Sequence, residues 1–302
     1  MKIVVFGTSP FAVPTLERLA ERHEVVGVVT QPDRPAGRGH KLVPTPVKRA
    51  AQERGLAVFT PERLRPFIDD VRGLGADAFA VASYGKIVPQ AMLDVVPIAF
   101  NVHPSLLPLY RGATPLQSAI RDGRSETGVT IIAMDAGMDT GDVLLQERTP
   151  LGASETYGEL HDRLAERGAE LLIDALAEYE AGSLTRTPQD VLAAETGIDA
   201  AQIAATATRP LRKDDLQVDW SRTPEQIVNV VRSLAPVPAA RAVLEGEPVK
   251  VLGARVAGAG ESEGIVTADE GVVHRGVVLL RVVPPNRSAM SAGAWRRSAV
   301  RA

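Results

Sequence analysis

Short apolar segments alternate with amphipathic ones along the first two-thirds of the chain. The apolar segments are rich in Val, Ile and Ala and are bounded by Gly, Pro or Asp; they lie at Ile3–Phe6, Val25–Thr30, Ala78–Ser83, Ala99–Val102 and Val129–Met134. Unbroken apolar runs of this length are typical of parallel strands that are covered on both faces. The alternation predicts an α/β fold, a Rossmann-like doubly wound and mainly parallel sheet whose ligand crevice lies at the carboxyl ends of its strands.

Two segments between these runs carry helix signals. Thr45-Pro46 offers a cap followed by proline at the first helical position, and Gly55 ends that segment. A longer helix is predicted from about Glu155 to Tyr179, because leucines recur there at helical spacing before Gly182.

The last third of the chain has a different pattern. Residues 183–207 mix Pro, Gly, Ala and Thr without periodicity, which predicts a linker between domains. A helix is expected at Pro224–Leu234, followed by short Val-rich strands at Ala242–Leu244, Val249–Leu252, Gly264–Thr267, Val272–His274 and Val277–Val283. Several short strands at this spacing indicate a small β-barrel of the OB-like kind. We therefore divide the chain into domains at 1–182 and 208–302, joined by 183–207.

Composition narrows the class of protein. The 302 residues are 45% hydrophobic and include no cysteine, which excludes disulfides and thiolate metal sites. No run approaches the roughly 18 apolar residues of a membrane helix, and the first apolar run stops at Gly7, too early for a signal-peptide core. These features favour a cytoplasmic protein that binds no membrane, and we expect a monomer.

The net charge of −3 is unevenly distributed. Residues 208–302 hold 14 Lys/Arg against 10 Asp/Glu, whereas residues 1–207 hold 20 against 27. A basic C-terminal third suggests a polyanionic partner for that region, although random scatter of surface charge explains this feature equally well.

Asn101 and His103 are the first candidate chemical groups. They follow an apolar run, and residues two apart on a strand face the same side, so both side chains can face one substrate in the crevice. The amide of Asn101 can donate to a developing oxyanion, and His103 can move a proton near neutrality. The alternative is a turn asparagine beside an ordinary loop histidine.

Asp139 lies in a second candidate segment, Met134-Asp135-Ala136-Gly137-Met138-Asp139-Thr140-Gly141-Asp142, directly after another strand. Most such segments are solvated Asp/Gly turns. The functional alternative is a carboxylate delivered to the same crevice, where it orients His103 or a water molecule. Asn, His and Asp without a serine, a cysteine or a metal cluster suit direct acylation of an amine, so we expect no metal.

These motifs resemble those of the 10-formyltetrahydrofolate-dependent transformylases. The resemblance is carried by Asn101-x-His103, Ser105-Leu106-Leu107-Pro108, Tyr110-Arg111-Gly112, Pro115 and Gly137-Met138-Asp139-Thr140-Gly141, and it covers residues 1 to about 180. It implies the formyltransferase fold, 10-formyltetrahydrofolate as co-substrate, and Asn101, His103 and Asp139 as the catalytic trio. It also implies that folate contacts Ser83, Tyr84 and Gly85, and Ser105, Leu106, Leu107 and Pro108. As a structural feature, Ser83-Tyr84-Gly85 suits a strand-to-helix turn equally well.

The acceptor is inferred from two further regions. The loop Gln31–Lys41 has a Gly and Pro content that excludes regular structure, and Arg34, Arg38, Lys41 and Lys48 bring positive charge to the mouth of the site, as on a loop that follows a phosphate backbone. An ordinary solvent loop is the alternative. The loop resembles the insertion with which methionyl-tRNA formyltransferases hold the acceptor end of initiator methionyl-tRNA.

The C-terminal region also resembles those enzymes, through Asp219-Trp220-Ser221 and Pro236-Val237-Pro238. It departs from them where Pro285-Asn286-Arg287-Ser288 replaces a lysine-rich segment before Met290-Ser291-Ala292, and Arg287 is expected to supply the charge. An enzyme that formylates a sugar nucleotide or another small amine is the main alternative. A formate-releasing hydrolase and a non-catalytic dinucleotide- or RNA-binding protein are further ones, although Gly7-Thr8-Ser9-Pro10 lacks the dinucleotide fingerprint.

Overall fold

The chain forms two compact units in a computed structural model that describes residues 1–36 and 41–299. The first unit comprises residues 1–112, 127–149 and 161–207, and the second comprises 113–126, 150–160 and 208–302. The second unit thus includes helix α5 (Pro115–Arg121), which packs on helix α9 (Pro224–Leu234). The linear division at 182 and 208 stays a prediction.

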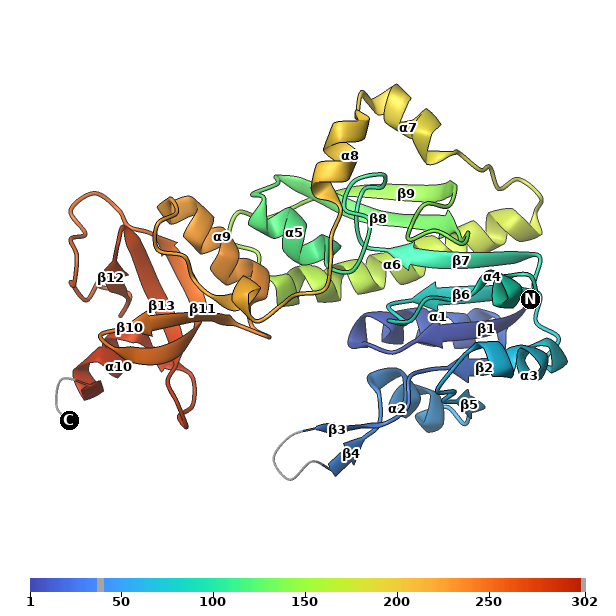
Figure 1. The fold of residues 1–302 in the computed structure, drawn as a ribbon, viewed down its shortest axis with the longest axis horizontal. Coiled ribbons are helices and arrows are strands. Elements are labelled where there is room, and N and C mark those ends of the chain that lie inside the picture. The colour runs from blue at the N-terminus through green and yellow to red at the C-terminus, as the bar shows by residue number, and fades with distance from the viewer. Residues whose placement is uncertain (37–40, 300–302) are drawn as a thin grey trace. The chain divides into compact units, whose positions relative to one another are not determined.

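A seven-stranded sheet forms the centre of the first unit (Figure 1). Its strands run in the order β5-β2-β1-β6-β7-β8-β9. The neighbours from β5 to β7 pair parallel with one another, and β8 is antiparallel to β7. The bounds are β1 Lys2–Gly7, β2 Glu24–Val29, β5 Val58–Phe59, β6 Ala78–Ala82, β7 Ile98–His103, β8 Glu126–Ala133 and β9 Val143–Pro150. The predicted mainly parallel sheet is confirmed.

Both faces of this sheet are covered, which explains why its strands are apolar throughout. Val4 and Phe6 of β1 pack with Val71 of helix α3 (Ile68–Gly73) and Met92 of helix α4 (Gln90–Leu93). On the other face helix α6 (Tyr157–Glu180) approaches the sheet closely, because a Cβ at Gly168 would lie 2.6 Å from a methyl group of Val102. Helix α1 (Val13–Arg22) joins α6 there through an ion pair between Arg18 and Glu166.

The predicted helices form close to their expected bounds. In helix α2 (Pro46–Glu53) the hydroxyl of Thr45 accepts a hydrogen bond from the Lys48 amide, as a cap should. The predicted linker contains two helices, α7 (Gln189–Thr196) and α8 (Ala200–Thr206). Short 3₁₀ turns lie at Pro10–Ala12, Arg65–Phe67 and Asp214–Leu216.

One expectation about the early basic loop is wrong. Strands β3 (Arg34–Ala36) and β4 (Lys41–Val43) pair antiparallel as a two-stranded ribbon, although Gly and Pro were expected to exclude regular structure. Both strands of such a ribbon are edge strands, where a proline is tolerated because alternate backbone nitrogens face away from the partner strand.

The second unit is built on an antiparallel sheet with β10, β11, β13 and β12 in that order and β14 paired to β13. The bounds are β10 Ala240–Leu244, β11 Glu247–Val256, β12 Val272–His274, β13 Val277–Val283 and β14 Met290–Ser291, with helix α10 at Ala292–Ala299. Helix α9 buries Ile227, Val231 and Leu234 against it. The strand expected at Gly264–Thr267 is reduced to an isolated antiparallel bridge between Val266 and Val272: Gly264 has φ +75°, and the Thr267 hydroxyl bonds within its own turn.

Candidate active site

The strand β7 carries two of the predicted site residues at its carboxyl end. β7 lies between β6, to which it is parallel, and β8, to which it is antiparallel. His103 is buried, with 4% of its surface exposed, and Asn101 is half-buried. Because the two residues are separated by one position, both side chains point to the same side of the strand.

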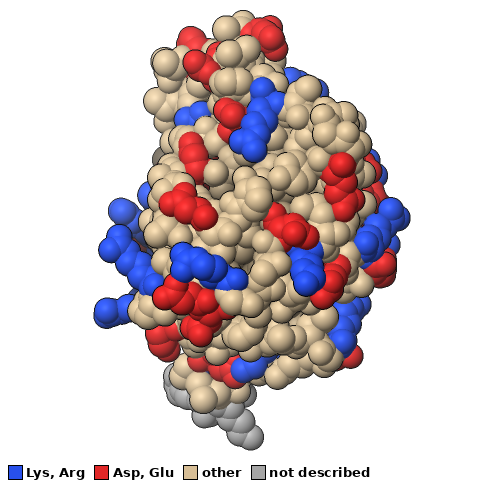
Figure 2. Space-filling view, turned by 90° about the vertical axis from the view of Figure 1, so that its right-hand side faces the viewer, with Lys and Arg blue, Asp and Glu red and all other residues tan. Residues whose placement is uncertain are grey.

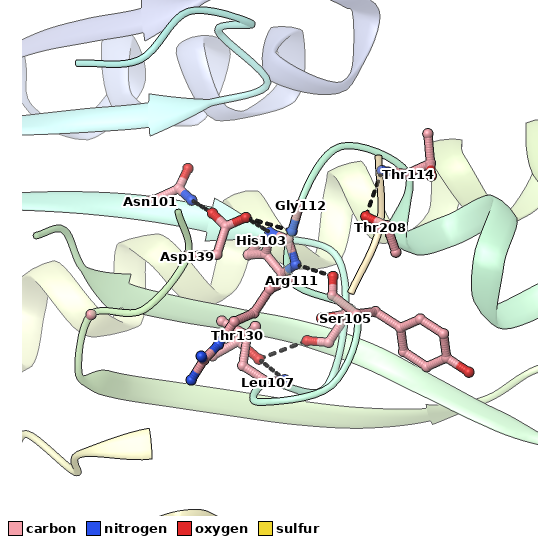
Figure 3. A network of polar contacts seen from close by, with 12 residues as sticks. Asn101, His103, Ser105, Leu107, Arg111, Gly112, Thr114, Thr130, Asp139 and Thr208 are labelled. Atoms are coloured by element: carbon pink, nitrogen blue, oxygen red, sulfur yellow. Dashed lines mark hydrogen bonds and ion pairs between the residues drawn. The ribbon is translucent and has the colours of Figure 1, made fainter. Parts of the chain in front are cut away.

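Asp139 connects these two side chains (Figure 3). Its Oδ1 accepts a hydrogen bond from Asn101 Nδ2 at 3.3 Å, and its Oδ2 accepts one from the Gly112 amide at 2.9 Å. His103 Nδ1 lies 3.6 Å from Oδ2, in ion-pair range but too far for a hydrogen bond. The structure therefore brings the three predicted residues together around one carboxylate.

The hydrogen bond at Nε2 of His103 determines which ring nitrogen carries a hydrogen. Nε2 lies 3.0 Å from the carbonyl oxygen of Tyr110, which can only accept, so Nε2 carries a hydrogen. Nδ1 then faces Asp139 Oδ2, and a doubly protonated ring would present a donor on that side. Nε2 of His103 is thus held by a hydrogen bond, while Nδ1 lies beside the Asp139 carboxylate.

The loop that delivers Asp139 is shaped by its own side chains. The Asp135 carboxylate accepts from the Gly137 amide and the Thr140 hydroxyl, so this acidic residue serves the loop. A Cβ at Gly141 would collide with the carbonyl oxygen of Ala133. Asp139 itself has φ +56°, a conformation that costs a residue with a side chain about 1–3 kcal/mol.

Gln189 is a contributor that the sequence did not indicate. It begins helix α7 in the predicted linker, and its side-chain amide donates to the carbonyl oxygens of Asp139 and Gly141 at 2.8 Å each. No motif or periodicity surrounds it, so only the folded chain brings it to the loop.

A pocket opens beside the trio. Asn101 and Asp139 supply its polar groups near β7, and Asp135 and Gly137 lie on the loop side. The remaining lining is mainly apolar and comprises Ile87, Val88, Ile132, Met134, Ala136 and Met138. Ile87 and Met138 are exposed, with 78% and 61% of their surfaces open. The site therefore combines a mainly apolar wall with a small set of polar groups.

The residues predicted to contact folate occupy different environments. Ser83 and Gly85 are exposed and have positive φ angles, whereas Tyr84 is buried with its ring against Phe6. Burial raises the pKa of Tyr84 to about 12, and its hydroxyl has no hydrogen-bond partner among the described residues.

The segment of residues 105–108 packs inward. Ser105, Leu107 and Pro108 are buried and Leu106 is half-buried. The carbonyl oxygen of Ser105 accepts from Thr130, and that of Leu107 accepts from Gln146. This segment therefore supports the end of β7 from inside, and its contact with folate stays a prediction.

The residues predicted to bind RNA are only partly described. Arg34 is exposed, and Lys48 is tied to Asp33, with Nζ 2.8 Å from a carboxylate oxygen. Arg38 lies outside the described residues, and of Lys41 only the backbone is described. Arg287 is exposed and donates to the Ser298 hydroxyl at 3.1 Å.

Membrane spans and metal centres are both absent from residues 1–36 and 41–299. No helix in these ranges is long and apolar enough to cross a membrane. Within the same ranges, no group of three or more His, Asp or Glu side chains is placed to hold a metal ion.

Two protein-family models match the chain. The model described as formyl transferase matches residues 1–176, and the formyl transferase C-terminal domain matches residues 210–299. The first match covers more than half of the chain and includes all three residues around the carboxylate.

Relatives and solved structures agree with these matches. Methionyl-tRNA formyltransferase of Heliobacterium modesticaldum is 42% identical over 100% of this chain and 92% of its own, and that of Geobacter sulfurreducens is 44% identical over 87% and 80%. Among structures, WlaRD, a sugar 3N-formyl transferase, superposes with a TM-score of 0.65 at 16% identity over 95% of this chain and 99% of its own. HypX from Aquifex aeolicus in complex with tetrahydrofolic acid gives 0.62 at 16% identity over 98% and 46%. The structures support the shared fold, and the sequence relatives show that this chain belongs to the methionyl-tRNA formyltransferase family.

Proposed function

We propose that the protein transfers the formyl group of 10-formyltetrahydrofolate to the α-amine of methionyl initiator tRNA. The observation that carries this proposal is the convergence of Asn101, His103 and Asp139 beside a pocket with an apolar wall. An amine is already a nucleophile, so the site needs no serine or cysteine. It needs donors for an oxyanion and a route for one proton.

The pocket suits the folate donor in its chemistry. Ile87, Val88 and Met138 offer aliphatic and thioether surfaces against which the faces of a fused heteroaromatic ring can pack. Asn101 and Asp139 lie at the same pocket and would face the formyl group that the bound donor supplies. The predicted contacts of Ser83, Gly85 and Leu106 complete the proposed binding site.

The proposed reaction uses each member of the trio once. The methionyl amine attacks the formyl carbon while Asn101 Nδ2 and protonated His103 Nδ1 donate to the formyl oxygen, on which negative charge develops. The bond between the formyl carbon and N10 of the folate then breaks, and its electron pair stays on N10. Asp139 passes the proton lost by the amine, through water, to N10, so formylmethionyl-tRNA and tetrahydrofolate are the products.

The C-terminal sheet offers a candidate surface for the tRNA backbone. Arg241 and Lys250 are cross-strand neighbours on β10 and β11, and Arg281 lies on β13. Each is exposed and alternates with buried residues, so the three cations share the outer face, and none has an ion pair within the described residues. We define these three residues as the basic row, and we propose that it binds phosphates together with Arg34 and Arg287.

Net charge alone does not identify such a surface. On the face drawn in Figure 2, Lys and Arg side chains are interspersed with Asp and Glu. Several cations of the second unit are also paired, including Arg209 with Asp215 and Arg297 with Glu270. Unpaired cations in a row are therefore a better guide than the sum of charges.

We further propose that the enzyme works as a monomer in the cytoplasm, which light scattering and cell fractionation can test.

The experiment is a transfer assay with the purified protein, 10-formyltetrahydrofolate and methionine-charged initiator tRNA. We expect N-formylmethionine after deacylation and its loss in His103→Ala. Transfer to amino sugars in place of tRNA would contradict the proposed acceptor. Transfer that persists at the wild-type rate in His103→Ala would contradict the proposed roles.

A further inference from the structure

Gln189 is almost fully buried, with 4% of its surface exposed, although it lies in the segment that the sequence predicts as a linker. Its Oε1 accepts from Nε and Nη2 of Arg111, at 2.9 and 2.7 Å. Its Nε2 donates to the carbonyl oxygens of Asp139 and Gly141, at 2.8 Å each. The side-chain amide therefore uses both of its hydrogens and both lone pairs of its oxygen.

This arrangement leaves one orientation for the amide and one suitable residue type. A flipped amide would set its NH₂ group against the Arg111 guanidinium and its oxygen against two carbonyls. A glutamate would keep the bonds from Arg111 and lose both donors. The two carbonyls would then face a carboxylate in a buried place, which is unfavourable.

The two segments that Gln189 joins both carry the site. On one side it holds the backbone of Asp139, whose φ of +56° needs support from its surroundings. On the other side it holds Arg111, between Tyr110, whose carbonyl bonds His103 Nε2, and Gly112, whose amide bonds Asp139 Oδ2.

We propose that Gln189 is a positioning residue that holds the Asp139 carboxylate against Asn101, His103 and Gly112. It touches none of the reacting groups and acts through Asp139. The inference deepens the proposed formyl transfer and rests on it for its kinetic consequence. Its structural consequence, the position of Asp139, holds for any acceptor.

The first test measures the position of Asp139 directly. The Gly112 amide donates to Asp139 Oδ2, so its hydrogen exchange, followed by NMR, reports whether the carboxylate is in place. We expect Gln189→Leu and Gln189→Glu to accelerate exchange at Gly112 about tenfold or more, as we also expect of Asp139→Ala. Glu195→Leu, an exposed position on the same helix, should leave it unchanged. Wild-type protection of Gly112 in both Gln189 variants would overturn the proposal.

The second test asks whether Gln189 acts through Asp139. We expect Gln189→Leu to lower kcat about 10- to 100-fold with KM for tRNA within about threefold. In an Asp139→Asn background the same change should cost less than about threefold, because the carboxylate it positions is already gone. Full additivity of the two losses would overturn the proposal, since it would indicate general destabilisation.

The two tests separate this inference from the proposed function. A wild-type protein that does not formylate methionyl-tRNA would contradict the proposed acceptor, while the exchange at Gly112 would still decide the role of Gln189. If Gln189→Leu does not fold, the nearly isosteric Gln189→Glu carries both measurements.

Discussion

The proposed catalytic trio and the basic row hold their polar groups in opposite ways. Asp139 bonds Asn101 and Gly112 through its carboxylate, and its backbone carbonyl bonds Gln189. The side chains of Arg241 and Lys250, by contrast, are exposed and have no ion pair within the described part of the second unit. The trio is therefore held by hydrogen bonds, whereas the basic row presents exposed cations without ion-pair partners among the described residues.

The difference follows from what each region is proposed to recognise. Charge that develops on one oxygen during a reaction is stabilised only by donors that are already in place. A phosphate backbone presents many similar charges, so long flexible cations can follow it without a fixed position. Mutations in the two regions should therefore change different kinetic constants.

The largest effects on the rate of formyl transfer are expected from substitutions in the trio. Asn101→Ala removes a proposed oxyanion donor and should lower kcat about 100- to 1,000-fold, with KM for tRNA within about threefold. Asp139→Asn should lower kcat by a comparable factor, because an amide has only one oxygen and cannot accept from Gly112 on one side and from Asn101 on the other. Steady-state formylation of charged tRNA measures both variants.

Binding provides the control for these two variants. Titration with a folate analogue and with uncharged tRNA should give affinities close to those of the wild type. A collapse of tRNA affinity in Asn101→Ala would mean that the trio also binds RNA, and the comparison between the two regions would fail.

A smaller effect on a different constant is expected in the basic row. Reversing two charges, in Arg241→Glu/Lys250→Glu, should raise KM for tRNA about tenfold at low salt and leave kcat unchanged. The slope of log KM against log salt should also fall by about one for each phosphate that the variant protein does not neutralise. Formylation assays at several salt concentrations give both quantities.

Arg255 is the matched control because its guanidinium is already paired. It forms ion pairs with Glu261 at 2.6 Å and with Asp269 at 2.9 Å, and these two carboxylates neutralise its charge and weaken its attraction for RNA. Arg255→Gln should leave KM for tRNA unchanged. If it raises KM as much as the double reversal does, charge in the second unit acts as a sum and the basic row has no special role.

The convergence of Asn101, His103 and Asp139 was predictable because its signals are local. Asn101 and His103 end an apolar strand, and strand alternation places both on one side; Asp139 follows the neighbouring strand. Gln189 had no local signal, since it follows Pro188 in a segment without periodicity and meets its partners 48 to 78 positions away in the sequence. Residue contacts of that range are set by packing, which a pattern of neighbours does not contain.

The sequence was equally silent about which way Tyr84 faces. Ser83-Tyr84-Gly85 fitted both a folate-binding segment and a strand-to-helix turn, and the choice depends on packing. The ring lies in the core against Phe6, and its hydroxyl has no partner in the described part of the chain. A direct role of this hydroxyl in binding folate therefore requires the core to rearrange.

Tyr84→Phe tests this point with a smaller effect. The buried hydroxyl has no hydrogen-bond partner among the described residues, so its loss should change the unfolding free energy at pH 7 by less than about 1 kcal/mol. The raised pKa means that folded Tyr84 keeps its proton while unfolded tyrosine loses it above about pH 10. Wild-type stability should thus fall between about pH 10 and 12, by up to about 1.4 kcal/mol per pH unit, and the variant should lack this contribution.

Urea unfolding of the two proteins across this pH range measures the difference, and other titrating groups cancel between them. Formyl transfer should stay within about twofold of the wild type. A tenfold loss of activity in Tyr84→Phe would place the hydroxyl in the reaction and contradict its assignment to the core.

The smallest effect is expected where fixed polar groups serve stability alone. In the second unit the Arg255 guanidinium lowers the pKa of Glu261 to about 2 and that of Asp269 to about 2. A lowered pKa stabilises the folded state above the unfolded value of about 4.5, and the gain is lost as pH falls toward 2.

Both tryptophans of the chain, Trp220 and Trp295, lie in this unit, so their fluorescence during urea unfolding reports on it. We expect the urea midpoint to fall less steeply between pH 5 and 3 in Glu261→Gln than in the wild type or in Glu247→Gln, an exposed position on β11. Formylation at pH 7 should be unchanged in both variants, because fixed polar groups contribute to the rate only where they face the reacting atoms. If Glu261→Gln lowers kcat, that distinction between the catalytic trio and the rest of the molecule is wrong.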